Sequence, residues 1–261
     1  RINGLNYKKV SDEITLGREE PLGTTDLVLG VGSSEVLRAA AWAYCSLGGN
    51  VVEPYPSYSA VGSAAAAIPG ANVVRKIVPL DRENRLDVAA ICAAIDSDTR
   101  VVVICNPNNP TGYVYSKKEL NDLATLVKKH DLFIIVDEVY REFTYDGAVH
   151  HSVLTISGLD EHAILVDSMS KRYSMCGARI GCLVSKNKEL MDAALKFAQS
   201  RLSPPTLGLH ASEAAMDEPL SYIKEVTKVY LERRNTLVGL LQQIPGITVS
   251  VPQGAFYCLV Q

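Results

Sequence analysis

The sequence predicts an α/β protein in which a mainly parallel sheet is covered by helices on both faces. Short runs rich in Val, Ile and Leu, bounded by Gly, Pro, Asn or Asp, are typical of buried strands. Amphipathic segments lie between several of these runs, and that alternation favours three layers, α/β/α, around a parallel sheet. The 261 residues, of which 47% are hydrophobic, suffice for one large core or for a large core with a second, smaller one.

The strand candidates follow one another between residues 26 and 185. Seven are expected, at residues 27–31, 51–53, 73–78, 101–105, 132–136, 163–166 and 180–184. Only a short loop joins the last two, so the last is a candidate antiparallel member of the sheet. Ligands of such sheets bind at the carboxyl ends of the strands, where we expect the site.

Helices are expected at residues 36–45 and 116–130 within this alternation, and the chain becomes mainly helical after Lys186. The later helix candidates are residues 189–200, 206–216 and 220–243, with prolines before the second and Pro-Gly after the third. Residues 247–251 and 255–260 then alternate like two strands across the turn Pro-Gln-Gly.

The bulk composition argues against several classes of partner. A formal net charge of −3 gives no sign of the basic surface that nucleic acid or an anionic membrane would require. The sequence has no apolar run of the roughly 18 residues that a membrane helix needs, and its first residues do not read as a signal peptide. We therefore expect a cytoplasmic protein that acts on small molecules.

No metal site is expected. The six cysteines lie apart, without a CxxC pair and in apolar surroundings, so they are interpreted as buried reduced thiols. His150 and His151 are adjacent, but a pair without a third ligand nearby is more typical of a solvated loop.

Lys171 lies among hydroxyl groups in the segment SMSKRYSMCGARIG, residues 168–181, and Arg179 follows eight residues later. A desolvated lysine amine can form a Schiff base with an aldehyde, while the guanidinium of an arginine matches a phosphate geometrically. The segment therefore suits a carbonyl cofactor that carries a phosphate. A surface turn with two ordinary cations is the alternative that this segment alone leaves open.

Two further segments place polar groups at the ends of expected strands. Residues 105–112, CNPNNPTG, form a rigid loop in which an asparagine amide could donate to a ring oxygen, although a plain turn also explains the loop. Asp137 follows the buried-type run 133–136, and Tyr140 comes three residues later. A carboxylate at that depth needs a cationic partner, and a protonated pyridine nitrogen would serve.

These three motifs, in this order and at this spacing, resemble those of fold-type I pyridoxal-phosphate enzymes of the class I/II aminotransferase family, which includes aspartate and histidinol-phosphate aminotransferases. The resemblance extends from about Asp26 to the end of the chain and implies pyridoxal 5′-phosphate as the cofactor. It implies that Lys171 binds the cofactor's aldehyde and later acts as general base, and that Asp137 pairs with the pyridine nitrogen. Tyr140 and Asn109 would donate to the ring's phenolic oxygen.

The resemblance also implies two sets of phosphate ligands. One set lies on the lysine side and consists of Ser168, Ser170 and Arg179. The other is Ser33 and Ser34, at the start of a helix whose free N–H groups attract anions, although simple helix capping by these serines is the plainer interpretation when they are taken alone. Tyr58 matches the aromatic residue that stacks on the ring, but an aromatic in a Pro-rich loop, taken alone, is more often a packing residue.

The resemblance implies a domain division and an assembly. We expect a large cofactor-binding domain over residues 1–205, then interdomain helices and an incomplete small α+β domain over residues 206–261. Family members are longer at both ends, and no arginine of this chain matches the one that binds the substrate's carboxylate. We therefore expect a piece of a longer protein, with a naturally shortened protein as the less favoured alternative. A homodimer is implied, in which Tyr7 is a weak candidate to reach the partner's phosphate.

The function implied is transamination between an L-amino acid and a 2-keto acid. Decarboxylases, lyases and cyclising enzymes share the same cofactor residues, so another reaction on pyridoxal phosphate stays an alternative. A non-catalytic regulatory domain that binds the cofactor is a third possibility. The amino donor is not indicated by the motifs.

Overall fold

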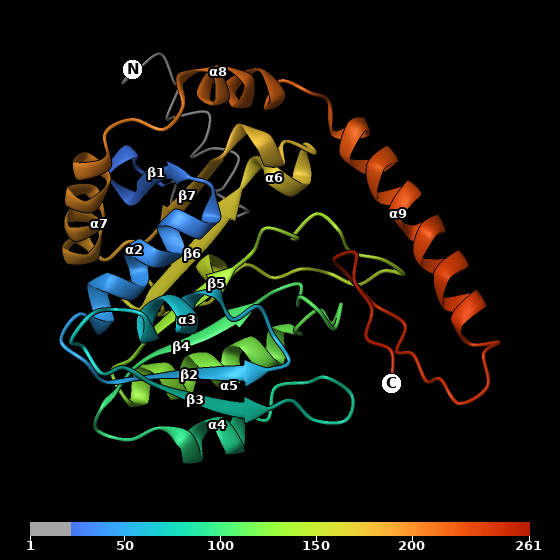
Figure 1. Ribbon diagram of the computed structural model, residues 1–261, viewed down its shortest axis with the longest axis horizontal. Helices are drawn as coiled ribbons and strands as arrows, with labels where there is room; N and C mark the ends of the chain where they lie inside the picture. Colours follow the sequence, from blue (N-terminus) through green and yellow to red (C-terminus); the bar gives the residue numbers. More distant parts are fainter. Residues whose placement is uncertain (1–21) are drawn as a thin grey trace.

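Seven strands form one sheet within residues 22–261, the part of the chain that the computed structural model describes (Figure 1). The strand order across the sheet is β1-β7-β6-β5-β4-β2-β3. The bounds are β1 (Leu27–Val31), β2 (Asn50–Tyr55), β3 (Val74–Pro79), β4 (Thr99–Cys105), β5 (Phe133–Asp137), β6 (Ala163–Ser168) and β7 (Ile180–Val184). All seven strands expected between residues 26 and 185 are confirmed. Tyr7 lies outside the described residues.

The register brings the carboxyl ends of the central strands to one edge. β3, β2, β4, β5 and β6 run parallel, and Asp137 lies opposite both Cys105 of β4 and Val166 of β6. β7 runs antiparallel to β6 and to β1, as the short loop before it suggested, and Gly181 pairs with Ser168. The segment between β6 and β7 therefore emerges at the same edge as Asp137.

Helices cover both faces of the sheet, so the three-layer fold is confirmed (Figure 1). One face packs against α2 (Ser33–Cys45), α3 (Ala60–Ala66) and α7 (Lys188–Arg201). The other packs against α4 (Val88–Ala94), α5 (Lys117–Lys129) and α8 (Thr206–Ala215). Alternate residues of β4 enter the two cores, because successive side chains of a strand point to opposite faces.

Residues within and next to α5 account for where this helix begins, which side it buries and where it ends. Ser116 and Glu119 form a reciprocal capping box at its start. Leu120, Leu123 and Val127 recur on one side at helical spacing, and all three are buried. Two lysines at the end of the helix complement its dipole.

The C-terminal part packs less tightly. α9 (Leu220–Leu241) lies at the side of the molecule, and Val238 is its single fully buried residue (Figure 1). The prediction of two strands at residues 247–251 and 255–260 is wrong. In their place the structure has an isolated bridge between Val249 and Val260, with hydrogen bonds joining Thr248 and Gln261. A two-stranded ribbon with no third strand is marginal in stability.

No helix described within residues 22–261 has both the length and the apolar character for a membrane span. The domain boundary at residue 205 and the cytoplasmic location stay predictions.

Candidate functional site

A pocket of about 190 Å³ opens at the carboxyl ends of β5 and β6. It is lined by Ser33, Ser34, Tyr58, Asn109, Asp137, Val139, Tyr140, Ser168, Ser170, Lys171, Cys176, Arg179 and Tyr257. All the site residues singled out in the sequence are in this lining, although they come from segments far apart in the chain. The sequence analysis did not identify Val139, Cys176 or Tyr257.

Lys171 reaches the pocket from α6 (Met169–Arg172), a single turn that follows β6 directly. Ser168 caps this turn by accepting the Ser170 N–H at 3.1 Å, and its hydroxyl donates to the Ile180 carbonyl at 3.0 Å. The Lys171 Nζ lies 5.5 Å from the ring centroid of Tyr140 and 5.6 Å from that of Phe256. The amine therefore points into a space that is walled partly by aromatic rings.

Asp137 ends β5 and is almost completely buried, with 4% of its surface exposed. The pKa of its carboxyl is raised to about 7, mainly by burial. The Val139 N–H at 3.2 Å and the charge of Lys171 lower this pKa, whereas the charge of Asp167 raises it. A cation placed against this carboxyl would keep it ionised. The depth of Asp137 thus fits the expectation of a cationic partner.

Asn109 lines the pocket, and side-chain hydrogen bonds of its neighbour Asn108 hold their loop in place. The Asn108 amide donates to the Ser57 and Tyr115 hydroxyls, both at 3.2 Å. Its carbonyl accepts from the N–H and the hydroxyl of Thr111. Since Ser57 precedes Tyr58, the same side chain ties the loop of Asn109 to the loop of the half-exposed Tyr58.

The opposite end of the pocket is suited to an anion. The α2 helix begins at Ser33, and its N-cap is Gly32, which offers no side-chain cap, so helix capping by Ser33 or Ser34 is not what the structure has. A Cβ on Gly32 would clash with the Arg179 guanidinium, and one on Gly181 would lie 2.5 Å from the Ser33 nitrogen. The two glycines thus let Arg179 approach the positive end of the helix.

Arg179 and Lys171 have no carboxylate ion-pair partner among the residues that the structure describes. The Arg179 Nη1 donates to the Cys176 carbonyl at 2.8 Å. Two cations beside an uncapped helix start form a donor set that matches a phosphate group and an aldehyde on one molecule.

Tyr257 is a pocket residue that the sequence analysis missed. Its hydroxyl lies 2.7 Å from the Tyr140 hydroxyl, and the two rings meet edge to face. Burial and, to a smaller extent, this hydrogen bond raise the pKa of Tyr140 far above its ordinary value, so its phenol stays protonated well above neutral pH. The sequence showed only a turn at residues 252–254, whereas the bridge between Gly254 and Thr144, just before Phe256 and Tyr257, is visible only in the structure.

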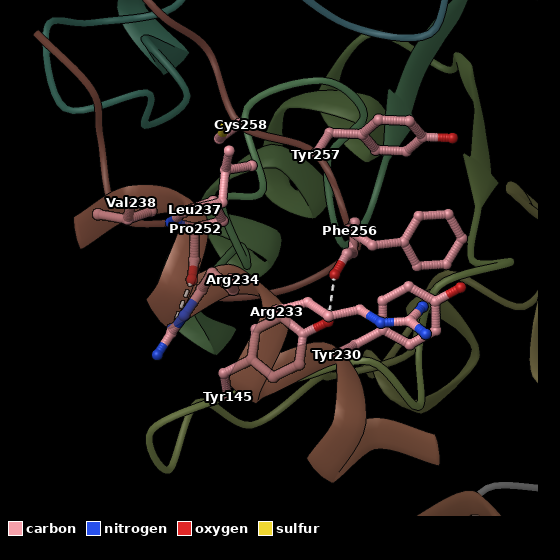
Figure 2. A pocket seen from close by; sticks show the side chains of 11 residues that line it. Tyr145, Tyr230, Arg233, Arg234, Leu237, Val238, Pro252, Phe256, Tyr257 and Cys258 are labelled. Atoms are coloured by element: carbon pink, nitrogen blue, oxygen red, sulfur yellow. Dashed lines mark hydrogen bonds between the residues drawn. The ribbon is translucent and has the colours of Figure 1, made fainter. Parts of the chain in front are cut away.

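A second pocket of about 190 Å³ lies next to Tyr257, between α9 and the C-terminal segment (Figure 2). Its lining is mostly apolar, and the Tyr230 ring stacks on Phe256 with the centroids 4.8 Å apart. Arg234 donates to the Pro252 carbonyl, and the Tyr145 hydroxyl donates to the Ala255 carbonyl. These contacts hold the segment that carries Tyr257 against the rest of the chain.

Two expectations about the surroundings are wrong. His150 is not in a solvated loop, since its side chain is 8% exposed and its Nε2 lies 3.4 Å from the Glu138 Oε2. Burial raises the pKa of Glu138 to about 8 and lowers that of His150 to about 3, which favours a neutral acid facing a neutral imidazole. Cys176 is exposed and lines the pocket, whereas a buried thiol was expected. The absence of a metal stays a prediction.

A model of the aminotransferase class I and II family matches residues 17–261 of the sequence. This chain belongs to that family. It is 31% identical over 239 residues to the aspartate aminotransferase of Bacillus sp. (strain YM-2), with 90% of this chain and 60% of the relative covered. It is 32% identical over 245 residues to the glutamate-pyruvate aminotransferase AlaA of Haemophilus influenzae, again with 90% and 60% covered.

Solved structures of the same family share this fold. The aspartate aminotransferase of Rhizobium meliloti superposes with a TM-score of 0.90 at 27% identity, covering 97% of this chain and 64% of that one. The aromatic aminotransferase of Pyrococcus horikoshii OT3 gives 0.88 at 28% identity, with 97% and 68% covered. The chain thus spans about three fifths of the length of the curated relatives it matches.

The family uses pyridoxal phosphate. The residues of this pocket fit that cofactor. Lys171 supplies an amine for the aldehyde, Arg179 and the uncapped start of α2 supply donors for the phosphate, and the buried Asp137 supplies an acceptor for a protonated ring nitrogen.

Proposed function

We propose that this chain forms the cofactor-binding part of a pyridoxal-phosphate-dependent aminotransferase that moves an amino group between an L-amino acid and a 2-keto acid. The observation that carries the proposal is the convergence of Lys171, Asp137 and Arg179 in one pocket at the carboxyl edge of the sheet. Family membership supports the same reaction.

In this proposal ten of the pocket residues fill five roles. Lys171 binds the aldehyde, and Asp137 pairs with the ring nitrogen. Tyr140 and Asn109 donate to the phenolic oxygen, while Tyr58 stacks on the ring. The phosphate ligands are Ser33, Ser34, Ser168, Ser170 and Arg179.

The bound cofactor supplies a carbonyl carbon that exchanges amines and a ring that withdraws electrons. The chain's own part is to orient groups and to move protons. When it is not bonded to the aldehyde, the Lys171 Nζ would act as a general base toward the proton on the substrate's Cα and then as a general acid that donates this proton. The Asp137 carboxylate would keep the ring nitrogen protonated. The Tyr140 phenol would be a hydrogen-bond donor, and its raised pKa extends this well above neutral pH.

We further propose a cofactor domain over residues 1–205, with residues 206–261 leading into a smaller domain. The whole protein is proposed to be a two-fold homodimer, since symmetric dimers are the commonest assembly of soluble enzymes. Neither the donor amino acid nor the acceptor is assigned.

The test is a Lys171→Ala variant of the longest available form of the protein. It should lose the visible absorption of the lysine-bound cofactor and all transamination with a panel of amino acids and 2-oxoglutarate. The matched control is Lys186→Ala, because Lys186 lies beyond the far end of β7 from the pocket and pairs with Asp26.

An adduct reducible by borohydride on another lysine in Lys171→Ala would contradict the assignment. Release of CO₂ or elimination of a substituent by the wild type, without consumption of 2-oxoglutarate, would place the chain among the other enzymes that use this cofactor.

A further inference from the structure

Four charged side chains form a closed ring next to the pocket. Arg141 contacts the Glu142 Oε1 through Nε at 2.8 Å and the Asp167 Oδ2 through Nη1 at 2.7 Å. Arg172 contacts the same two oxygens, through Nε at 2.7 Å and through Nη2 at 2.8 Å. Two of these four contacts have hydrogen-bond geometry. We call this group the ion-pair ring.

The ion-pair ring is withdrawn from solvent. The side chains of Arg141, Asp167 and Arg172 are 3% or 4% exposed, and that of Glu142 is 20% exposed. Charges at this depth lose their hydration, and apolar side chains of similar volume often give equal or greater stability. A gain in folding stability is therefore a poor explanation for the ring. A better explanation is that two planar guanidinium groups fix the relative positions of the segments that they join.

Three of the four residues in the ring are sequence neighbours of a pocket residue. Arg141 follows Tyr140, Asp167 precedes Ser168, and Arg172 follows Lys171. The ring thus joins the loop after β5, the end of β6 and α6, which are the three segments that carry the lysine end of the pocket.

α6 needs such a tertiary anchor. It has four residues, and a single helical turn is not stable by itself, because fixing its backbone costs more than its hydrogen bonds return. Ser168 caps the start of the turn, while Arg172, the last residue of the turn, contacts Asp167 and Glu142. The direction in which Lys171 leaves the turn therefore depends on both ends being held.

We propose that the ion-pair ring positions the Lys171 amine, with Arg172 as its principal positioning residue. The ring does not touch the cofactor. It acts by fixing α6 against the loop of Tyr140, so that the amine meets the aldehyde in a reactive orientation. The inference rests on the proposed function, since it assumes that Lys171 is the residue that binds the aldehyde.

The test compares Arg172→Gln, Arg172→Lys and Glu142→Gln with the wild-type full chain. The first removes the charge, the second keeps the charge without the fork, and the third weakens the ring at its most exposed member, where folding is least at risk. Lys186→Gln is the matched control, because it breaks the 2.7 Å contact with Asp26 at the far end of β7. Each protein is checked by far-ultraviolet circular dichroism and urea unfolding.

The readouts are the rate at which pyridoxal phosphate labels Lys171, trapped with borohydride and located by mass spectrometry, and the circular dichroism of the bound cofactor in the visible range. Arg172→Gln should label Lys171 more slowly by roughly tenfold or more and should change the visible band, because loss of orientation slows a reaction between held groups. Arg172→Lys should recover part of both, and Lys186→Gln should match the wild type.

Two results would overturn the inference in distinguishable ways. Wild-type labelling and an unchanged visible band in folded Arg172→Gln and Glu142→Gln would show that the ring is only structural. If Arg172→Gln does not fold, Glu142→Gln alone decides between these outcomes. Failure of the wild type itself to be labelled at Lys171 would remove the proposed function, and this inference with it.

Discussion

Asp137→Asn should stabilise the cofactor-free protein, and increasingly so as the pH rises. The Asp137 carboxyl has an ordinary pKa of 3.8, and its burial in the folded state raises this pKa to about 7. Between these values the folded state binds more protons than the unfolded state, so the stability that this group contributes below its unfolded pKa is lost as the pH rises through the folded pKa. Asparagine carries no charge and escapes this loss.

The magnitude follows from the increase in the pKa of Asp137 from 3.8 to about 7, which is about 3. At about 1.4 kcal/mol for each pKa unit, the loss in the wild type approaches about 4 kcal/mol above pH 7, and more than half of it falls between about pH 5 and pH 8. A small domain has a total stability of only about 5–15 kcal/mol, so the change is within reach of an unfolding experiment.

The assay is urea unfolding of the wild type, Asp137→Asn and Asp131→Asn across this pH range. Asp131 is the control, since its side chain is 97% exposed. The difference in the free energy of unfolding between Asp137→Asn and the wild type should grow by about 2 to 3 kcal/mol, while Asp131→Asn should run parallel to the wild type. Glu138 also has a raised pKa, but it is present in all three proteins, so its contribution to the pH dependence cancels in the differences between them.

A difference that stays constant with pH would refute the reasoning, because it would mean that the folded protein already holds Asp137 ionised. Adding pyridoxal phosphate should shrink or reverse the advantage of asparagine, since a protonated ring nitrogen would give the carboxylate the cationic partner that it otherwise lacks.

Three further changes test the other parts of the pocket. Arg179→Ala should raise the dissociation constant for pyridoxal phosphate by about tenfold or more, as expected for loss of a charge-assisted hydrogen bond, and Arg179→Lys should recover only part of this; equal constants would exclude the phosphate role. Gly32→Ala and Gly147→Ala should each lower thermal stability, because both glycines have positive φ angles, but only Gly32→Ala should weaken cofactor binding, since Gly147 has open space around it. Equal cofactor affinity of those two variants would argue against a phosphate site formed by Arg179 and the start of α2. Tyr257→Phe removes the hydroxyl that contacts Tyr140 while keeping the ring, so it should alter the visible spectrum of bound cofactor with little loss of stability, and an unchanged spectrum would count against that contact.

The sheet could be predicted because its strands are specified locally. β5 is a run of Phe, Ile, Ile and Val that ends at an aspartate, and such a run is stable mainly when both of its faces are buried in a parallel sheet. Once the parallel order is known, the polar residues at the strand ends must meet at one edge. The position of Asp137 beside the segment of Lys171 follows from that geometry.

The C-terminal residues show where local pattern fails. Residues 247–251 and 255–260 alternate as strands do, yet only one bridge forms between them. Alternation reports a preference for extended backbone, whereas a strand also needs a neighbour that completes its hydrogen bonds. His150 and Cys176 were misjudged for a related reason, because their exposure depends on what packs over them.

The sequence by itself determined the fold class, the order of strands along the chain and the residues that carry the cofactor motifs, because each of these depends on neighbours within a few positions. Only the tertiary structure decided the contacts that tune those residues. The hydroxyl that meets Tyr140 belongs to a residue 117 positions away, and the ion-pair ring joins residues 141 and 142 to 167 and 172. The pKa of Asp137 likewise depends on burial by several segments at once. Burial and electrostatic interaction are properties of distance in space, and a single sequence does not encode that distance in any local pattern.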